Sequence, residues 1–416
     1  MSRPHKIRRS VGLRGRRYKA RPHPLFVLFV IVALGGLIYL GTLIYPPVHS
    51  AIMNWEAGRG VVQQPQLPGG GGAGEPEAPV TEQQVVTTSP AARVGNLRAV
   101  YAPPALLADR AAFSAFISGL TDAGLNAVMV DIKNADGQVL FASDNRNAND
   151  WEAVVPGAFD LGELSEQLAG EGLSLVVRMS AFRDEIAARG NNDYYVMFEG
   201  TEMRWLDNLP GVGRPWLNPH SEGARAYLTE LALEAVGLGA VMVVLDDVQF
   251  PPNSLVQADF GDTGGLGRNA RLAAFAEEFT GALAAVGARG AIYMPAINLA
   301  SDEPNVTFFG GSPAEILSEY TVLGALPFQF PFGFESESLQ LPNPTEDLSA
   351  TLTQVIRAVG GQVLGSTIVL IQGGSLPGGV QYTDAQIRGQ VETLAGLGIN
   401  EFIFYATYVG HYQVGG

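Results

Sequence analysis

The chain has 416 residues, of which 47% are hydrophobic and 16% are charged, and it contains no cysteine. This length can bury one large core or two modest ones, which excludes a wholly disordered chain. The absence of cysteine excludes disulfide bonds, thiolate metal sites and cysteine nucleophiles.

The first 24 residues form a basic segment with nine Lys and Arg and no acidic residue. The apolar run from Leu25 to Tyr45 has no charged residue and is long enough to cross a hydrocarbon core of about 30 Å. A basic segment before an apolar one keeps the N-terminus in the cytoplasm. The sequence thus predicts a cytoplasmic tail (1–24) and a transmembrane signal anchor (25–45) that contacts the lipid bilayer.

The alternative for this segment is a cleaved signal peptide. The apolar region of such a peptide is about 7 to 15 residues long and ends in small residues. Here the run is longer and leads into Tyr45-Pro46-Pro47. We therefore expect an uncleaved anchor and a single-pass membrane protein whose residues after Pro46 lie outside the cytoplasm.

The segment 46–94 is rich in Gly, Pro, Gln and Thr without a sustained period, which predicts a flexible, disordered linker. Beyond residue 45 the chain has 17 Lys and Arg against 41 acidic residues, a formal charge of −24. Such a charge repels nucleic acid and anionic lipid, so we expect no nucleic-acid partner. It suits a neutral or cationic ligand, and it is equally compatible with a role in solubility alone.

From residue 97 onward, short apolar runs alternate with amphipathic stretches. The predicted strands are 97–101, 126–133, 173–179, 240–247, 290–296, 321–330, 366–372 and 401–407. The predicted helices are 106–122, 161–169, 222–236, 269–286, 313–319, 345–359 and 383–397. The strands are almost continuously apolar, which indicates a parallel sheet covered on both faces.

Eight strands alternating with helices predict an α/β fold, a (β/α)8 TIM barrel over residues 95–416. Only nine residues follow the eighth predicted strand, so we expect the last helix to be absent. A doubly wound sheet is the alternative, but no G-x-G-x-x-G motif follows the first strand.

Charged residues gather at the carboxyl ends of three neighbouring strands, where the functional sites of such barrels lie. They are Asp131 and Lys133, then Arg178, then the pair Asp246 and Asp247. Since side chains alternate along a strand, Asp246 and Asp247 cannot both face the barrel axis, so we expect one of them to point inward and the other toward the helix layer. At least one of the two cations should contact a carboxylate at this rim.

Four segments carry a family resemblance: 125–143, 177–184, WLNPHS (216–221) and LDDVQFP (245–251). They resemble motifs of the "putative glycoside hydrolase" family of bacterial exported (β/α)8 barrels, which reads N-A-V-V-I-D-V-K-D-x-x-G, R-x-x-x-F-K-D, W-x-D-P-Y and F-D-Y-I-R-F-P. The resemblance extends from about residue 95 to about residue 410 and is more specific in its first half. It identifies the chain as a divergent member.

The positions that match the family motifs are Asp131, Lys133, Gly137, Arg178, Phe182, Asp184, Trp216, Pro219, Asp246, Phe250 and Pro251. Other positions depart from them: Asn218, His220, Asp247 and Gln249 stand where the family has Asp, Tyr, Tyr and Arg. On the seventh strand the family carries W-L-Q-D-F, whereas this chain keeps Gln372 and lacks the carboxylate.

The resemblance implies a glycan-cleaving enzyme of the cell envelope, with Asp246 as the main candidate acid. Because the family shares Asp246 and not Asp247, we expect Asp246 to face the barrel axis. Asp247 should then point toward the helix layer and hold the turn that leads to Pro251-Pro252.

Glycoside hydrolysis ordinarily uses two carboxyl groups. Asp131 is the first candidate for the second group, and Asp302 and Glu303 follow it. Glu401 begins the eighth strand at the opposite end of the barrel, so we expect it to be structural.

The candidate residues for binding a polysaccharide or oligosaccharide are Lys133, Arg178, Trp216, Gln372 and Tyr405, with Trp151 and Trp205 as further stacking surfaces. Two alternatives stay open: a barrel that binds glycan without cleaving it, and an envelope scaffold that binds protein. No cofactor or metal is expected, because the five histidines show no ligand spacing.

Overall fold

The computed structural model describes residues 95–207, 213–251, 257–301, 306–330, 333–363, 366–375 and 380–405. The expected tail, anchor and linker lie outside these residues, as do Asp302, Glu303 and the chain after residue 405. The chain divides into two units, Met1–Gln83 and Gln84–Gly416, and all described residues belong to the second. Over the described residues, no helix has the length and apolar character that a bilayer crossing requires.

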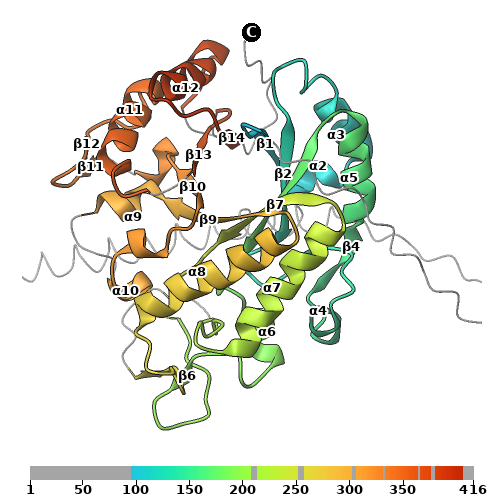
Figure 1. Cartoon of the computed structure of the whole chain (residues 1–416), viewed down its shortest axis with the longest axis vertical. Coiled ribbons are helices and arrows are strands. Elements are labelled where there is room, and N and C mark those ends of the chain that lie inside the picture. Colours follow the sequence, from blue (N-terminus) through green and yellow to red (C-terminus); the bar gives the residue numbers. More distant parts are fainter. Residues whose placement is uncertain are drawn as a thin grey trace, which may run out of the picture. The chain divides into compact units, whose positions relative to one another are not determined.

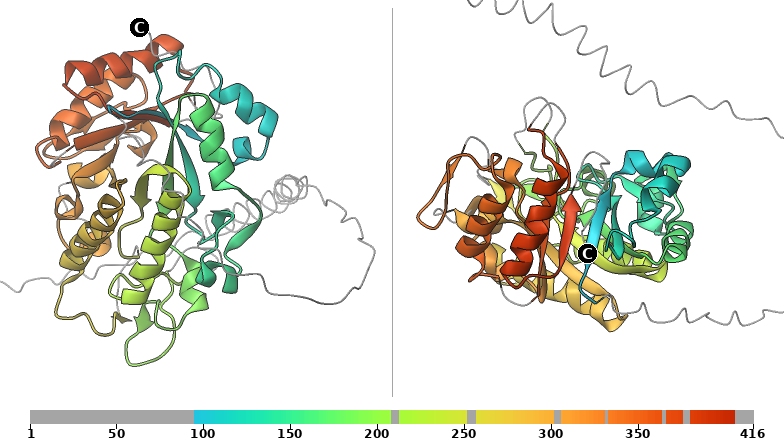
Figure 2. Two further views of the ribbon diagram at one scale, coloured as in Figure 1. Left: turned by 45° about the vertical axis from the view of Figure 1, so that its right-hand side comes forward. Right: turned by 90° about the horizontal axis from the view of Figure 1, so that it is seen from above.

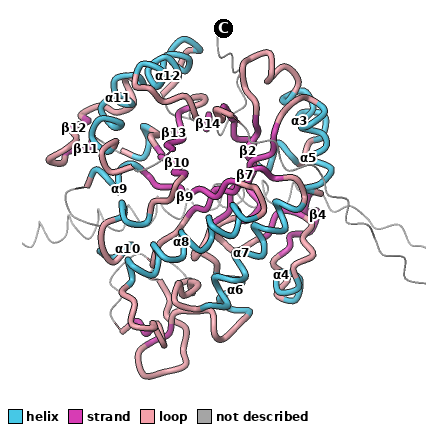
Figure 3. The backbone as a smooth tube through the Cα atoms, viewed as in Figure 1, coloured by secondary structure: helices cyan, strands magenta, loops and turns pink. Residues whose placement is uncertain are grey.

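The centre of the second unit is a closed barrel of parallel strands, which confirms the predicted (β/α)8 fold (Figures 1 and 3). Around the ring the strands are β1 (Arg98–Ala102), β2 (Ala127–Lys133), β5 (Ser174–Ser180), β7 (Ala240–Asp246), β9 (Arg289–Pro295), β10 (Tyr320–Gly324), β13 (Ser366–Gln372) and β14 (Phe402–Tyr405). Pairing of β1 with both β2 and β14 closes the ring, which rules out the doubly wound sheet.

Helices surround the strands, as the views in Figure 2 show. They are α3 (Arg110–Ile117), α5 (Leu161–Gly170), α7 (Glu222–Gly237), α8 (Arg268–Ala285), α11 (Leu348–Val359) and α12 (Asp384–Gly396). The first predicted helix is divided into α2 (Pro104–Leu107) and α3, because the Asp109 side chain caps the backbone N–H groups of Ala111 and Ala112. The stretch predicted as a helix from residue 313 is a short 3-10 turn, η1 (Pro313–Ile316).

The two faces of the strands build two apolar cores. One face fills the barrel interior with residues such as Met129, Val176, Val244 and Leu370. The other face packs against the helices. Because alternate residues enter different cores and both are apolar, the strands read as continuous apolar runs.

Several short elements that the sequence pattern did not predict follow the carboxyl ends of the barrel strands. After β2 come β3 (Val139–Phe141), α4 (Arg146–Asp150) and β4 (Val154–Phe159). After β5 come α6 (Glu185–Gly190) and β6 (Met197–Phe198), which pairs with β8 (Ala258–Asp259) after β7. After β9 come α9 (Ala296–Ala300) and α10 (Val306–Phe309). After β10 come η2 (Pro327–Gln329), β11 (Phe334–Glu335) and β12 (Gln340–Leu341), so the strand predicted to reach residue 330 ends at Gly324.

Lys133 lies in the outer core, not at the rim where the sequence placed it. The pairing of β2 with β5 shifts register between Asp131 and Lys133, and this bulge turns Lys133 to the other face of the sheet. Its Nζ lies 2.9 Å from Asp184 Oδ2 and donates to the Ser180 carbonyl at 2.8 Å. Neither side chain of the ion pair has any exposed surface, so Lys133 does not lie open to a ligand as the sequence led us to expect.

Gly137 packs directly against this ion pair and adopts a left-handed backbone, with φ 90°. A Cβ at this position would overlap the Asp184 carboxylate. Asp184 also caps α6 by accepting the Ala187 N–H at 2.8 Å. The family positions Lys133, Gly137 and Asp184 therefore form one structural group that fastens the β2 loop to the start of α6.

Replacing Lys133 by Met should lower the free energy of unfolding by about 3–5 kcal/mol, because Asp184 would remain buried without its partner. Urea titration of the full chain measures this change. The control is Arg146→Met, which breaks an exposed ion pair with Asp150 and should leave the urea midpoint unchanged. Equal effects of the two substitutions would contradict the structural role of Lys133.

Candidate active site

The inward-facing residues at the carboxyl ends of the strands form the mouth of the barrel. Each of them comes two positions after an inward-facing residue of the inner core. They are Tyr101, Asp131, Arg178, Asp246, Tyr293, Gln372 and Tyr405. Acidic, basic and aromatic side chains thus meet in one layer above an apolar interior.

Arg178 is held on several sides. Its Nε donates to Asp131 Oδ1 at 2.7 Å and its Nη2 donates to Asp131 Oδ2 at 3.1 Å. The guanidinium carbon lies 5.1 Å from the centre of the Tyr101 ring and 5.5 Å from that of Tyr405, and these two rings stack at 4.8 Å. The predicted contact between a rim cation and a carboxylate is therefore confirmed.

Asp131 uses both carboxylate oxygens within this cluster. Besides the two bonds from Arg178, its Oδ2 accepts the Tyr101 hydroxyl at 2.6 Å. Burial, and then the charge of Asp131, raises the pKa of Tyr101 well above its ordinary value, so the phenol remains a neutral donor. Arg178, Asp131 and Tyr101 together form a cluster of zero net charge in the wall of the mouth.

Asp246 differs from Asp131 in two ways: its side chain is more exposed to solvent, and it lies farther from Arg178. Its side chain is 28% exposed, and its Oδ2 lies 4.0 Å from Arg178 Nη1. Burial, and then the adjacent Asp247, raises the pKa of Asp246 to about 7, although Arg178 and the Asp247 N–H oppose the shift. A carboxyl group that titrates near neutral pH can hold a proton and also release it, as a general acid must.

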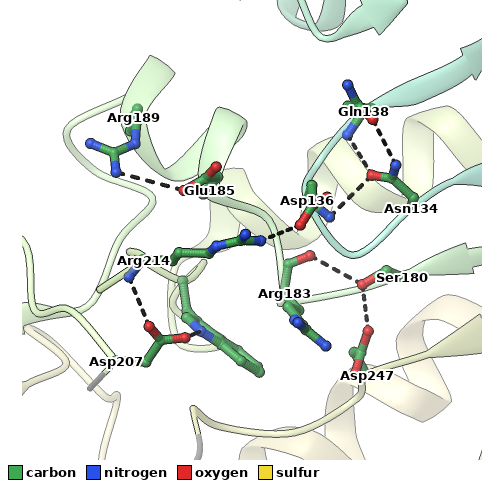
Figure 4. A network of polar contacts seen from close by, with 11 residues as sticks. Asn134, Asp136, Gln138, Ser180, Arg183, Glu185, Arg189, Asp207, Arg214 and Asp247 are labelled. Atoms are coloured by element: carbon green, nitrogen blue, oxygen red, sulfur yellow. Dashed lines mark hydrogen bonds and ion pairs between the residues drawn. The ribbon is translucent and has the colours of Figure 1, made fainter. Parts of the chain in front are cut away.

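Asp247 follows the last residue of β7 and adopts a left-handed backbone, with φ 53°. Its Oδ2 accepts the Ser180 hydroxyl at 2.7 Å (Figure 4). Ser180 is the register partner of Asp246 and continues the inward alternation of β5. The carboxylate does anchor the turn, as expected, but it stays on the side of Asp246 and does not point toward the helix layer.

Of the three tryptophans that the structure describes, two are buried. Trp216 is 3% exposed and its Nε1 donates to Asp207 Oδ2 at 2.8 Å, so it does not lie open to a ligand as expected. Trp205 is equally buried. Trp151 packs edge-on against Tyr194 and Tyr227.

Among the remaining predicted residues, Tyr405 lies half-buried at the mouth. Gln372 faces inward but is 2% exposed, and its side-chain amide donates to the Gly374 carbonyl, so it is not open to a ligand. Glu401 accepts the Leu97 N–H and pairs with Arg289 at the opposite end of the barrel, which confirms its structural role.

Tyr101 and Tyr293 are mouth residues that sequence reasoning missed. Counting every second residue from Ala99 and Ala291 along the inner face would have found both. The Tyr293 hydroxyl accepts the Gln329 side-chain N–H at 2.6 Å, and its ring lies against Gly324, where a Cβ would meet the hydroxyl oxygen at 2.5 Å. Within the described part of the chain, no cluster of three or more His, Asp or Glu side chains could hold a metal.

The raised pKa of Asp246 makes stability depend on pH with a definite sign. The folded chain keeps a proton on Asp246 up to about pH 7, whereas an unfolded chain releases it near the ordinary value of 3.8. Between these values the folded state binds more protons, so this carboxyl favours folding at low pH and its contribution is lost as the pH rises through the folded pKa.

Asp246→Asn removes this titration. The free energy of unfolding of the wild type, relative to the variant, should therefore fall by about 3–4 kcal/mol between about pH 4 and about pH 8. Urea titrations of both chains across this range give the difference directly. A difference that stays constant or grows with pH would contradict a carboxyl that holds its proton.

Comparison with known proteins identifies the family. A family model described as "Putative glycosyl hydrolase domain" matches residues 99–410. No curated protein matches the chain significantly. Among solved structures, the glycoside hydrolase domain of PgaB (BpsB) from Bordetella bronchiseptica has a TM-score of 0.51 at 16% identity, with 75% of this chain and 94% of that one covered.

Two further structures are less similar. The C-terminal domain of a chitinase-like protein from Desulfitobacterium hafniense has a TM-score of 0.45 at 12% identity, with 77% of this chain and 96% of that one covered. A hypothetical protein from Ruminiclostridium thermocellum has a TM-score of 0.39 at 20% identity, with 46% and 96% covered. At these identities the PgaB domain supports the fold alone, and the family match spans the barrel and every charged residue of its mouth. The chain therefore belongs to the glycosyl hydrolase-like family that this model describes.

Proposed function

We propose that the protein is a membrane-anchored, extracytoplasmic glycoside hydrolase-like protein that acts on a glycan of the cell envelope or its surroundings. Family membership supports the chemistry, and the basic and apolar segments before residue 46 support the location. The observation that carries the proposal is Asp246, which lies inward at the barrel mouth, partly exposed, with a pKa raised to about 7.

In the proposed reaction, protonated Asp246 gives its proton to the glycosidic oxygen as the bond from that oxygen to the anomeric carbon breaks. Water then supplies the hydroxyl group of the new reducing end and returns a proton to the site. Arg178 lies beside Asp246, and the Tyr405 ring packs against Arg178, so both side chains would contact the sugar. A neutral phenol at Tyr293 completes the lining, since burial, and then Asp246, raises its pKa well above the ordinary value.

The second carboxyl group decides between cleavage and binding. Asp131 can act as base or nucleophile only by releasing a bond from Arg178 or Tyr101, because both its oxygens already accept hydrogen bonds. This supports a second candidate function, in which the barrel has no catalytic activity. It would then bind a glycan or a protein of the envelope. In either function Asp246 faces the ligand.

Asp246→Asn should abolish the release of reducing ends when the full chain is incubated with a panel of envelope polysaccharides, because the amide cannot donate the required proton. The expected loss is at least about 100-fold, as for other general acids. The matched control is Asp150→Asn, which removes an exposed carboxylate on α4 and should retain activity. Binding that persists in a wild-type chain without any cleavage would support the binding barrel instead.

The membrane topology has its own test. Protease added to intact cells should degrade the part of the chain after residue 46, while the cell-associated N-terminal segment remains protected. Carbonate washing should leave the protein in the membrane fraction, since about 20 apolar residues anchor a helix stably. A soluble form whose N-terminus lies close to residue 50 would show that the segment is cleaved.

A further inference from the structure

We propose that Asp247, which stands where the family motif has tyrosine, is a positioning residue that keeps the proton on Asp246 and so raises the pH at which the site works. The inference rests on the proposed role of Asp246 as the acid. Its basis is an arrangement in which two consecutive carboxylates share one side of a strand end.

Consecutive residues of a strand ordinarily point to opposite faces. Asp246 is the last residue of β7, and the left-handed φ of 53° at Asp247 ends that alternation. Asp and Asn accept this conformation more readily than other residues that carry a Cβ. The turn brings the Asp247 carboxylate to the Ser180 hydroxyl, directly across the sheet from Asp246.

Asp247 forms no ion pair within the described part of the chain, and its carboxylate accepts a hydrogen bond from a neutral hydroxyl. Figure 4 shows this contact, with the Arg183 backbone carbonyl also accepting from Ser180. An unpaired carboxylate beside a second carboxyl group disfavours ionisation of that group.

The groups that face Asp246 come from the turn after β7 and from three other strands. Asp247 follows Asp246 directly in that turn, and Arg178 faces it from β5 at 4.0 Å. Asp131 on β2 is neutralised by the same Arg178, and Tyr293 on β9 stays a neutral phenol. Arg178 is therefore already paired with Asp131, whereas the charge of Asp247 acts on Asp246 without such a partner. Burial is the largest cause of the raised pKa of Asp246, and Asp247 is the next.

Asp247→Asn tests the inference because it keeps the size of the side chain, its tolerance of a left-handed backbone and an oxygen that can accept from Ser180. The titration of Asp246 is followed without any glycan, from the pH dependence of unfolding in four full-length chains: wild type, Asp246→Asn, Asp247→Asn and the double variant. For two chains that differ only at residue 246, the difference in the free energy of unfolding is plotted against pH. Its midpoint is the pH at which Asp246 titrates in that background. We expect the midpoint to fall by about one pH unit when residue 247 is Asn.

The control is Asp136→Asn, which removes a carboxylate from the loop after β2, where it pairs with Arg214 (Figure 4). This substitution lowers the net negative charge equally and should leave the midpoint in place. A midpoint that does not move with Asp247→Asn, or that moves as much with Asp136→Asn, overturns the inference.

Activity provides a second readout. If the wild type cleaves a glycan, the alkaline limb of its pH profile should shift downward in Asp247→Asn by the same amount as the midpoint, with KM little changed. If no chain cleaves any glycan while the midpoint still shifts, the enzyme assignment fails and the coupling between the two carboxyl groups stands.

Discussion

The two-residue alternation of side chains in a closed parallel barrel is the constraint on which the site depends. Each strand must fill the interior with every second residue, and the inward positions near its carboxyl end have no complete apolar layer above them. A polar side chain at such a position can face inward and yet reach solvent. Asp131, Arg178 and Asp246 occupy such positions on three adjacent strands, so their proximity follows from barrel geometry.

The alternation is broken at two places, and each break gives a charged residue a new role. The bulge after Asp131 sends Lys133 into the outer core, where it pairs with Asp184 and supports the loops. The left-handed residue after Asp246 leaves Asp247 on the same side as its neighbour. One break removes a charge from the mouth and the other adds one, so the net charge of the mouth is set by backbone geometry as much as by sequence.

Much of this arrangement could be predicted from the sequence. The eight strands were predicted because both their faces are buried, which leaves long apolar runs, and Arg178 and Asp246 follow by counting along those runs. Lys133 was misplaced because nothing in the local residue pattern marks the bulge. Trp216 was misjudged because its partner Asp207 lies in a long loop, whose path depends on contacts that periodicity does not encode. The short elements after β2 and β5 escaped prediction for the same reason.

The stacked rings of Tyr101 and Tyr405 lie on β1 and β14, the first and last strands of the barrel, and Arg178 packs against both. The wall of the mouth therefore spans the seam where the ring closes. Contacts between residues so far apart in sequence require the closure of a very long loop, which has an entropy cost. A chain that is still being synthesised can hold the residues of β2, β5 and β7 while it lacks Tyr405, so this wall can be completed only with the strand that closes the barrel.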